Sequence, residues 1–139
     1  MSNADLHRRS ADLFNRRDWA GFVADYAADC EYIDQARNST AKGREQVQEF
    51  EQGWVTAFSD AQMTDAQVID GDSQTVLLFT GSGTNDGPLG PLPATGRQAS
   101  MRFCEIREYN TDGKVVRGQL FYDQVTMLVQ LGHMTPPEG

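Results

Sequence analysis

The sequence is poor in cysteine and in long apolar runs, and each shortage excludes a class of protein. Two cysteines, Cys30 and Cys104, are too few for a disulfide framework or a cysteine-based metal clip. The longest apolar stretch is Val76–Phe79 and the segment Met1–Arg17 is polar, so we expect neither a membrane span nor a secretory leader. Together these features predict a cytoplasmic protein with reduced thiols.

Positive charge is also scarce. Twelve Lys and Arg residues stand against 20 Asp and Glu residues, which gives a net charge of −8 at pH 7. Because binding to nucleic acid or to an anionic membrane begins with a basic surface, we expect neither partner. The two histidines, His7 and His133, lie near opposite ends of the chain, so we expect no histidine-based metal site.

The order of helical and strand patterns predicts the fold class. The 139 residues have the length of one domain, and we expect a single domain over residues 1–139. The expected elements are helices that begin near Leu6, at Trp19 and at Gly43; strands over Cys30–Asp34, Gln62–Asp70, Gln74–Gly83, Arg97–Asn110 and Lys114–Tyr122; and a last helix over Gln124–Leu131. Helices followed by strands predict an α+β fold with helices on one face of an antiparallel sheet.

The last two strands predict a hairpin whose register decides which residues share a face. Asn110-Thr111-Asp112-Gly113 suits a three-residue turn with a bulge, closed by Asn110 and Lys114. That turn places Asp123 opposite Met101, Phe121 opposite Phe103, and Gln119 opposite Glu105. A two-residue turn at Asp112-Gly113 would shift the register by one residue, and we prefer the bulged turn.

The preferred face combines large apolar groups with carboxylates. Met101, Phe103 and Phe121 surround Glu105, Gln119 and Asp123 on it. Burying unpaired carboxylates in a plain core costs several kcal/mol, and a solvated face would not usually carry three large apolar groups. Apolar walls with a few polar groups are typical of a small-molecule site, so this face predicts a pocket.

Several short segments together resemble the SnoaL-like polyketide (ester) cyclases of the NTF2-like superfamily. These segments are Lys42–Glu45, Gly83–Gly87, Ala94–Arg97, Asp112–Val115, Tyr122–Gln124 and Leu128–Gly132. The resemblance implies a cone-shaped, strongly curved sheet wrapped around N-terminal helices, with an apolar cavity between them. It also implies a homodimer formed through the sheet, and ring closure by aldol chemistry on a hydrophobic carbonyl compound without metal or cofactor.

The resemblance implies that Asp123 is the catalytic acid/base. In the cavity, desolvation by its apolar neighbours would raise its pKa toward neutrality. The alternative from the residues alone is that Asp123 caps the last helix. Glu105 and Asp34 are further catalytic candidates, and their alternatives are an ion pair of Glu105 with Arg107 or Arg117 and a turn cap at Asp34.

Seven residues are candidates for substrate binding. We expect Asn85 and Gln119 to orient substrate oxygens and the others to form walls: Phe103, Phe121, Met101, Trp54 and Tyr26. The alternatives are a turn role for Asn85, a hydrogen bond from Gln119 to Glu105, and plain core packing for Trp54 and Tyr26.

Two classes of function remain open at this point. The first is a cofactor-free enzyme of cyclase type, or an epoxide hydrolase or isomerase of the same superfamily. The second is a non-catalytic module that binds small molecules or dimerises. We also expect the sheet face opposite the pocket to carry Cys104, Ile106, Leu120 and Tyr122, with Ile106 and Leu120 near the centre of a dimer interface.

Overall fold

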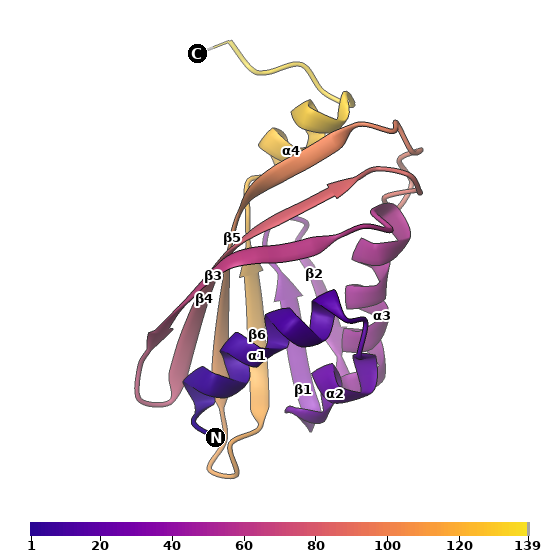
Figure 1. Cartoon of the computed structure of the whole chain (residues 1–139). Helices are drawn as coiled ribbons and strands as arrows, with labels where there is room; N and C mark the ends of the chain where they lie inside the picture. The colour runs from indigo at the N-terminus through magenta and orange to yellow at the C-terminus, as the bar shows by residue number, and fades with distance from the viewer. Residues whose placement is uncertain (139) are drawn as a thin grey trace.

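The computed structural model describes residues 1–138 and shows a curved six-stranded sheet with helices packed on one side (Figure 1). The elements in chain order are α1 (Asn3–Asn15), α2 (Trp19–Ala24), β1 (Tyr26–Asp34), β2 (Ser39–Lys42), α3 (Gly43–Ala57), β3 (Gln62–Asp70), β4 (Gln74–Thr84), β5 (Gln98–Tyr109), β6 (Val115–Phe121) and α4 (Gln124–Leu131). The α+β fold class predicted from the sequence is confirmed.

Local capping explains where the helices begin and end. Ser2 and Asp5 form a capping box at the start of α1, and the Asp18 carboxylate accepts from the Gly21 N–H to open α2. Helix α4 begins after Asp123 and ends at Gly132, whose φ of 84° fits the left-handed region that glycine tolerates. No helix within residues 1–138 is long and apolar enough to cross a membrane.

The strands have the order β2-β1-β6-β5-β4-β3 in the sheet, and burial alternates along them. On β5 the side chains of Phe103, Glu105, Arg107 and Tyr109 are buried toward the helices, and the residues between them lie on the outer face. The β1–β6 pair is parallel, which corrects the expectation of a wholly antiparallel sheet. A parallel pair requires a long connection, and the chain from β1 to β6 supplies it.

The register of the β5–β6 hairpin differs from the preferred prediction. The turn forms as expected, because the Asn110 N–H donates to the Lys114 oxygen at 2.9 Å and Gly113 has a φ of 76°. A bulge then shifts the pairing beyond Tyr109↔Val115, so that Glu105 lies opposite Leu120. The alternative register therefore holds along most of the hairpin, and a one-residue shift exchanges the two faces of β6.

Candidate active site

A cavity that is partly open to solvent lies between the helices and the inner face of the sheet. The cavity volume is about 70 Å³, several times the roughly 10–15 Å³ that one water molecule needs on the same measure. Seven of its 20 lining residues are aromatic, and every helix and five strands contribute to the wall. The lining residues are Ser10, Phe14, Phe22, Tyr32, Glu51, Trp54, Phe58, Ala61, Gln62, Met63, Phe79, Gly81, Ser82, Gly83, Ala99, Met101, Phe103, Glu105, Leu120 and Met127.

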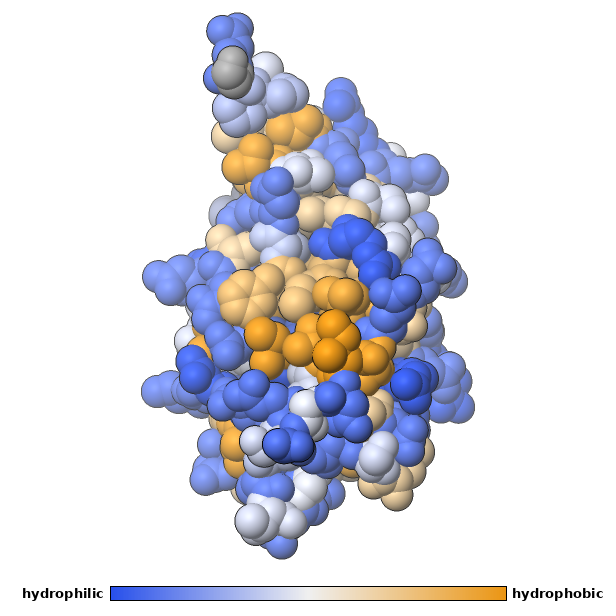
Figure 2. Space-filling view, turned by 90° about the vertical axis from the view of Figure 1, so that its left-hand side faces the viewer, coloured by the Kyte–Doolittle hydropathy of each residue, from blue (hydrophilic) through white to orange (hydrophobic). Residues whose placement is uncertain are grey.

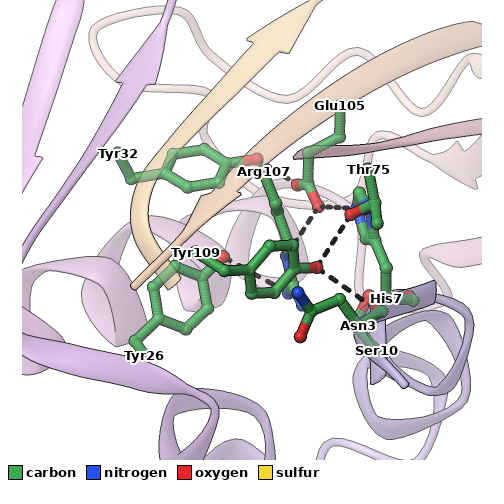
Figure 3. Close-up of polar contacts among 9 residues, drawn as sticks. All are labelled: Asn3, His7, Ser10, Tyr26, Tyr32, Thr75, Glu105, Arg107 and Tyr109. Atoms are coloured by element: carbon green, nitrogen blue, oxygen red, sulfur yellow. Dashed lines mark hydrogen bonds and ion pairs between the residues drawn. The ribbon is translucent and has the colours of Figure 1, made fainter. Parts of the chain in front are cut away.

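Glu105 is the most heavily bonded polar group on the cavity wall (Figure 3). It is 4% exposed; its Oε1 accepts from His7 Nε2 at 2.9 Å, and its Oε2 accepts from the Tyr32 hydroxyl. Arg107 lies two residues along the same strand, with its Nε 3.4 Å from Oε1. Burial alone would raise the pKa of Glu105, but the His7 hydrogen bond and the Arg107 charge lower it to about 2. Glu105 is therefore an ionised carboxylate.

A chain of hydrogen bonds runs from Glu105 toward the start of α1. Burial and the Arg107 charge lower the pKa of His7, which is therefore neutral and donates from Nε2 to Glu105. Its Nδ1 then accepts from the Thr75 hydroxyl at 2.7 Å. The Thr75 hydroxyl gives its one proton to His7, so it accepts from the Tyr109 hydroxyl 2.8 Å away, and the Tyr109 hydroxyl also lies 3.3 Å from the Asn3 oxygen. This chain orders the ring of His7 and holds Glu105 in place.

Arg107 supplies the positive charge beside the cavity. Its side chain is fully buried, and its guanidinium carbon lies 5.0 Å from the ring centre of Tyr26 and 5.7 Å from that of Phe22. Nη2 donates to the Tyr26 hydroxyl at 3.4 Å. Burial by itself would lower the pKa of Arg107, but the nearby Tyr26 and Glu105 oxygens raise it, so Arg107 keeps its charge.

Glu51 on α3 is a second carboxyl group on the cavity wall, and its surroundings are the opposite of those of Glu105. It is 6% exposed and lines the cavity, and it forms no hydrogen bond with any group in residues 1–138. Desolvation, followed by the charge of Glu105, raises the pKa of Glu51 well above its usual value. Glu51 is therefore a neutral carboxylic acid that faces the cavity.

The structure brings four of the sequence-predicted residues to the cavity wall: Trp54, Met101, Phe103 and Glu105. The rings of Trp54 and Phe103 meet edge to face, with centroids 6.0 Å apart. Tyr26 is fully buried behind the wall, against Phe22 and Arg107, and does not line the cavity. The binding role of the four wall residues stays a prediction.

The predicted position of Asp123 in the cavity is wrong. Its side chain is exposed and caps α4, accepting from the Thr126 N–H at 3.2 Å and from the Thr126 hydroxyl at 2.8 Å. These hydrogen bonds lower the pKa of Asp123, whereas the predicted role required a raised one. The helix-cap alternative is therefore the one that the structure adopts.

The register shift corrects the predicted positions of four residues on β6 and at its end. Gln119 and Phe121 lie on the outer face, where Gln119 accepts from Gln35 at 3.0 Å and Phe121 is 39% exposed. Leu120 and Tyr122, expected on the outer face, point inward: Leu120 lines the cavity and Tyr122 packs against Phe103. The bulge has exchanged the two pairs.

Asn85 and Asp34 are buried but do not line the cavity. Asn85 donates to the Ala57 and Gly87 oxygens and accepts from the Thr95 N–H, so it ties the 85–95 loop to the end of α3. Asp34 accepts from the Arg37 N–H at 3.1 Å and from the Tyr122 hydroxyl at 2.8 Å. Both predictions of a pocket position are wrong: neither residue is among those that line the cavity, and each side chain is held by hydrogen bonds elsewhere in the fold.

Sequence reasoning missed Glu51, His7 and Tyr32, whereas the alternative that Glu105 pairs with Arg107 is the one that the structure adopts. One signal for Glu51 was available: it lies four residues after Val47 and three before Trp54, on the core stripe of α3 where a charged residue is unusual. His7 lies on the same face of α1 as Ser10, Leu13 and Phe14, which are all buried. Among the described residues, no group of three or more His, Cys, Asp or Glu is placed to hold a metal ion.

Comparisons with known proteins place this architecture in a defined class. A protein from Catenulispora acidiphila with a ketosteroid isomerase-like fold, crystallised with trimethylamine, is 16% identical, with a TM-score of 0.78 over 94% of this chain and 97% of that one. A protein from Pseudomonas putida, provisionally described as a polyketide cyclase, is 19% identical, with a TM-score of 0.83 over 94% and 98%. IdmH from Streptomyces antibioticus, described in the same provisional way, is 22% identical, with a TM-score of 0.80 over 95% and 99%.

The fold is thus that of the NTF2-like, ketosteroid isomerase-like proteins. The family model of the SnoaL-like polyketide cyclases matches residues 4–131, and the chain belongs to this family. The resemblance stated from the sequence is confirmed. Comparison with the curated proteins gave no sequence match.

Proposed function

We propose that the protein is a cyclase-type enzyme that acts on a hydrophobic carbonyl compound by acid–base chemistry, without a metal or organic cofactor, and that Glu51 is its acid. One observation supports this most: Glu51 is a buried, neutral carboxyl group that opens on the cavity and has no hydrogen-bond partner in residues 1–138. A substrate oxygen that enters the cavity would accept the hydrogen bond that the Glu51 carboxyl group can donate.

The proposed reaction begins with a hydrogen bond from Glu51 to the substrate carbonyl oxygen. Transfer of the Glu51 proton to that oxygen turns the carbonyl into an enol as the other carboxylate oxygen takes a proton from the neighbouring carbon. The enol carbon then attacks a second carbonyl group of the same molecule. Glu51 gives its proton to the alkoxide that forms and takes the proton of the enol hydroxyl, so the first carbonyl group and the protonated Glu51 are both restored. The charge of Arg107 favours the transient Glu51 carboxylate, and the aromatic side chains of the wall offer apolar contacts to the substrate.

Glu105 has a different role in this scheme. Its oxygens already accept from His7 and Tyr32, and its low pKa makes it a weak base. It is a fixed negative charge that opposes ionisation of Glu51 in the resting enzyme. Glu105 thus does not transfer a proton itself; it influences the reaction by keeping Glu51 protonated.

Proton exchange at carbon tests this proposal without knowledge of the natural substrate. Aromatic ketones with acidic α-hydrogens are incubated with the protein in D₂O, and deuterium uptake is followed by NMR. Glu51→Gln should reduce the rate at least about a hundredfold, the usual contribution of general acid–base catalysis. Glu49→Gln, an exposed change on the same helix, should leave the rate unchanged.

Asp123→Asn separates this proposal from the family-based one. Because Asn caps a helix as well as Asp does, this variant should exchange at the wild-type rate. A loss with Asp123→Asn and none with Glu51→Gln would overturn the assignment of Glu51. Ketones that bind but show no exchange above the rate in buffer would instead indicate the non-catalytic binding module.

A further inference from the structure

The cavity has more acidic groups beside it than basic ones. Glu51 and Glu105 both line it, and Arg107 is the one buried guanidinium beside them in the part of the chain described here. The nearby Asp34 has its own partner, because Arg37 Nε donates to it at 3.2 Å. His7 is neutral in its hydrogen bonds with Glu105 and Thr75. Two carboxyl groups therefore line the cavity, and one buried cation lies beside them.

The rest of the cavity wall is suited to a positive charge. None of the described lining residues is Lys, Arg or His, and seven are aromatic: Phe14, Phe22, Tyr32, Trp54, Phe58, Phe79 and Phe103. An aromatic ring attracts a cation through the negative potential of its face, most strongly where water is excluded. Arg107, which lies over the rings of Tyr26 and Phe22, already shows this interaction next to the cavity.

Glu51 supplies a second, independent indication of a ligand. Its carboxyl group is more than nine-tenths buried, faces the cavity and has no protein partner within residues 1–138. Such a group calls for a partner that the folded chain does not provide. The cavity volume of about 70 Å³ fits a compact ligand.

We propose that the cavity binds a small organic ammonium ion, with the Glu51 and Glu105 carboxylates and the surrounding aromatic rings as its partners. This site is additional to the proposed carbonyl chemistry and does not require turnover. An ammonium ion near Glu51 favours the ionised carboxylate, so the protein releases protons when the cation binds. A neutral molecule of the same shape would release none.

The proton release follows from the groups that surround Glu51. They come from β1 (Tyr26, Tyr32 and Asp34) and from β5 (Glu105 and Arg107). Tyr26 and Tyr32 are neutral, as is the His7 ring that contacts Glu105, and Glu105 and Arg107 offset each other. Glu51 is thus the group whose ionisation responds to the cation, and cation affinity rises with pH until Glu51 is ionised in the free protein.

Calorimetry with choline chloride and its neutral carbon isostere, 3,3-dimethylbutan-1-ol, tests the proposal. Titrations are done at pH 7 in phosphate and in HEPES at constant ionic strength. The two buffers differ in their heat of ionisation, so the difference between the two binding heats gives the number of protons released, and each titration gives the affinity. We expect choline to bind at least about tenfold more tightly than the alcohol and to release protons, whereas the alcohol releases none. Choline affinity should also rise with pH.

Glu51→Gln keeps the size of the side chain and removes its charge. It should weaken choline binding at least about tenfold and abolish proton release and the pH dependence, whereas Glu49→Gln behaves as the wild type. Equal affinity for choline and the alcohol, no choline binding to the wild type, or unchanged proton release in Glu51→Gln would each overturn the proposal. Deuterium uptake by ketones is independent of these results, so a failure here is distinct from a failure of the proposed function.

Discussion

Two glutamates on one cavity wall have opposite protonation states because their partners differ. Glu105 accepts hydrogen bonds from His7 and Tyr32 and lies beside Arg107, whereas Glu51 has only the cavity in front of it. Each environment follows from the rule that hydrogen bonds and opposite charges favour the ionised form and desolvation disfavours it. The chemistry proposed for the cavity rests on this difference.

Glu51 should make the stability of the protein depend on pH. The folded-state pKa of Glu51 is raised, so its contribution is complete below about pH 4.5 and is lost as pH rises toward the folded pKa. Above pH 4.5 the wild type should therefore lose up to about 1.4 kcal/mol per pH unit relative to Glu51→Gln. Urea denaturation of both proteins at pH 5, 6 and 7 measures this difference, and a constant difference would contradict the assignment.

Glu105 gives a prediction of the opposite sign. Its folded-state pKa is lowered to about 2, so it contributes stability that is present above about pH 4.5 and is lost as pH falls toward 2. Glu105→Gln should therefore unfold more readily than the wild type at pH 6, since it leaves Arg107 buried without its carboxylate. The gap should narrow as pH falls from 4.5 to 3 in urea titrations. An equal gap at both ends of that range would argue against an ionised Glu105.

At the scale of elements, the bulge in the β5–β6 hairpin decides which side chains reach the cavity. It turns Leu120 inward and Phe121 outward, and it places Gly118 opposite Arg107. Gly118 leaves room for the ring of Tyr32 from the neighbouring strand, since a Cβ there would lie 2.6 Å from Tyr32 Cδ2. Tyr32 in turn donates to Glu105. A glycine on β6 thus positions a hydrogen bond in the cavity.

Gly118→Ala should destabilise the protein by about 1–3 kcal/mol through this overpacking. It should also weaken ligand binding, because the Tyr32 hydroxyl is displaced from Glu105. Gly53→Ala, on α3 with nothing within 4 Å of the added Cβ, is the matched control and should be stabilising by about 0.5–1 kcal/mol. Thermal and urea unfolding measure both changes. Equal effects of the two substitutions would show that Tyr32 does not occupy the space at Gly118.

At the scale of the whole molecule, the outer sheet face carries apolar groups that the fold leaves uncovered. Half-buried apolar side chains on neighbouring strands line it, among them Val76, Leu78, Cys104 and Ile106, with Phe121 exposed beside them. Figure 2 shows apolar residues gathered on one side of the molecule within a border of hydrophilic ones. Contiguous apolar groups of this kind are seldom left open to water in a monomer.

We propose that the protein forms a homodimer through this face, with Ile106 near the centre of the interface. Leu120, which the sequence also placed there, points inward and is not part of this face. Ile106→Arg should give a monomer, because an unpaired charge at a desolvated interface costs several kcal/mol. Thr56→Arg, an exposed change on α3, should leave the dimer intact. Light scattering at micromolar concentration measures both, and a monomeric wild type would refute the dimer.

Much of the fold could be predicted because its signals are local. The bounds of β3 and α4 agree with the predicted ranges, and the caps at Asp18 and Asp123 and the left-handed glycine at Gly132 lie within a few residues of the helices they delimit. The alternation of side chains along β5 predicts that Met101, Phe103 and Glu105 share one face, and all three line the cavity. The order of short segments indicated the family, which the match over residues 4–131 confirms.

The tertiary structure alone decided what the cavity can do. Glu105 is ionised because of His7, 98 residues away, and Tyr32, 73 residues away, and Glu51 is neutral because no group reaches it. The register of β6 depended on a bulge that the turn sequence did not specify, and Asp123 could serve either the helix end or the cavity. Periodicity and capping act within a few residues, whereas a pKa depends on the groups that folding brings into contact.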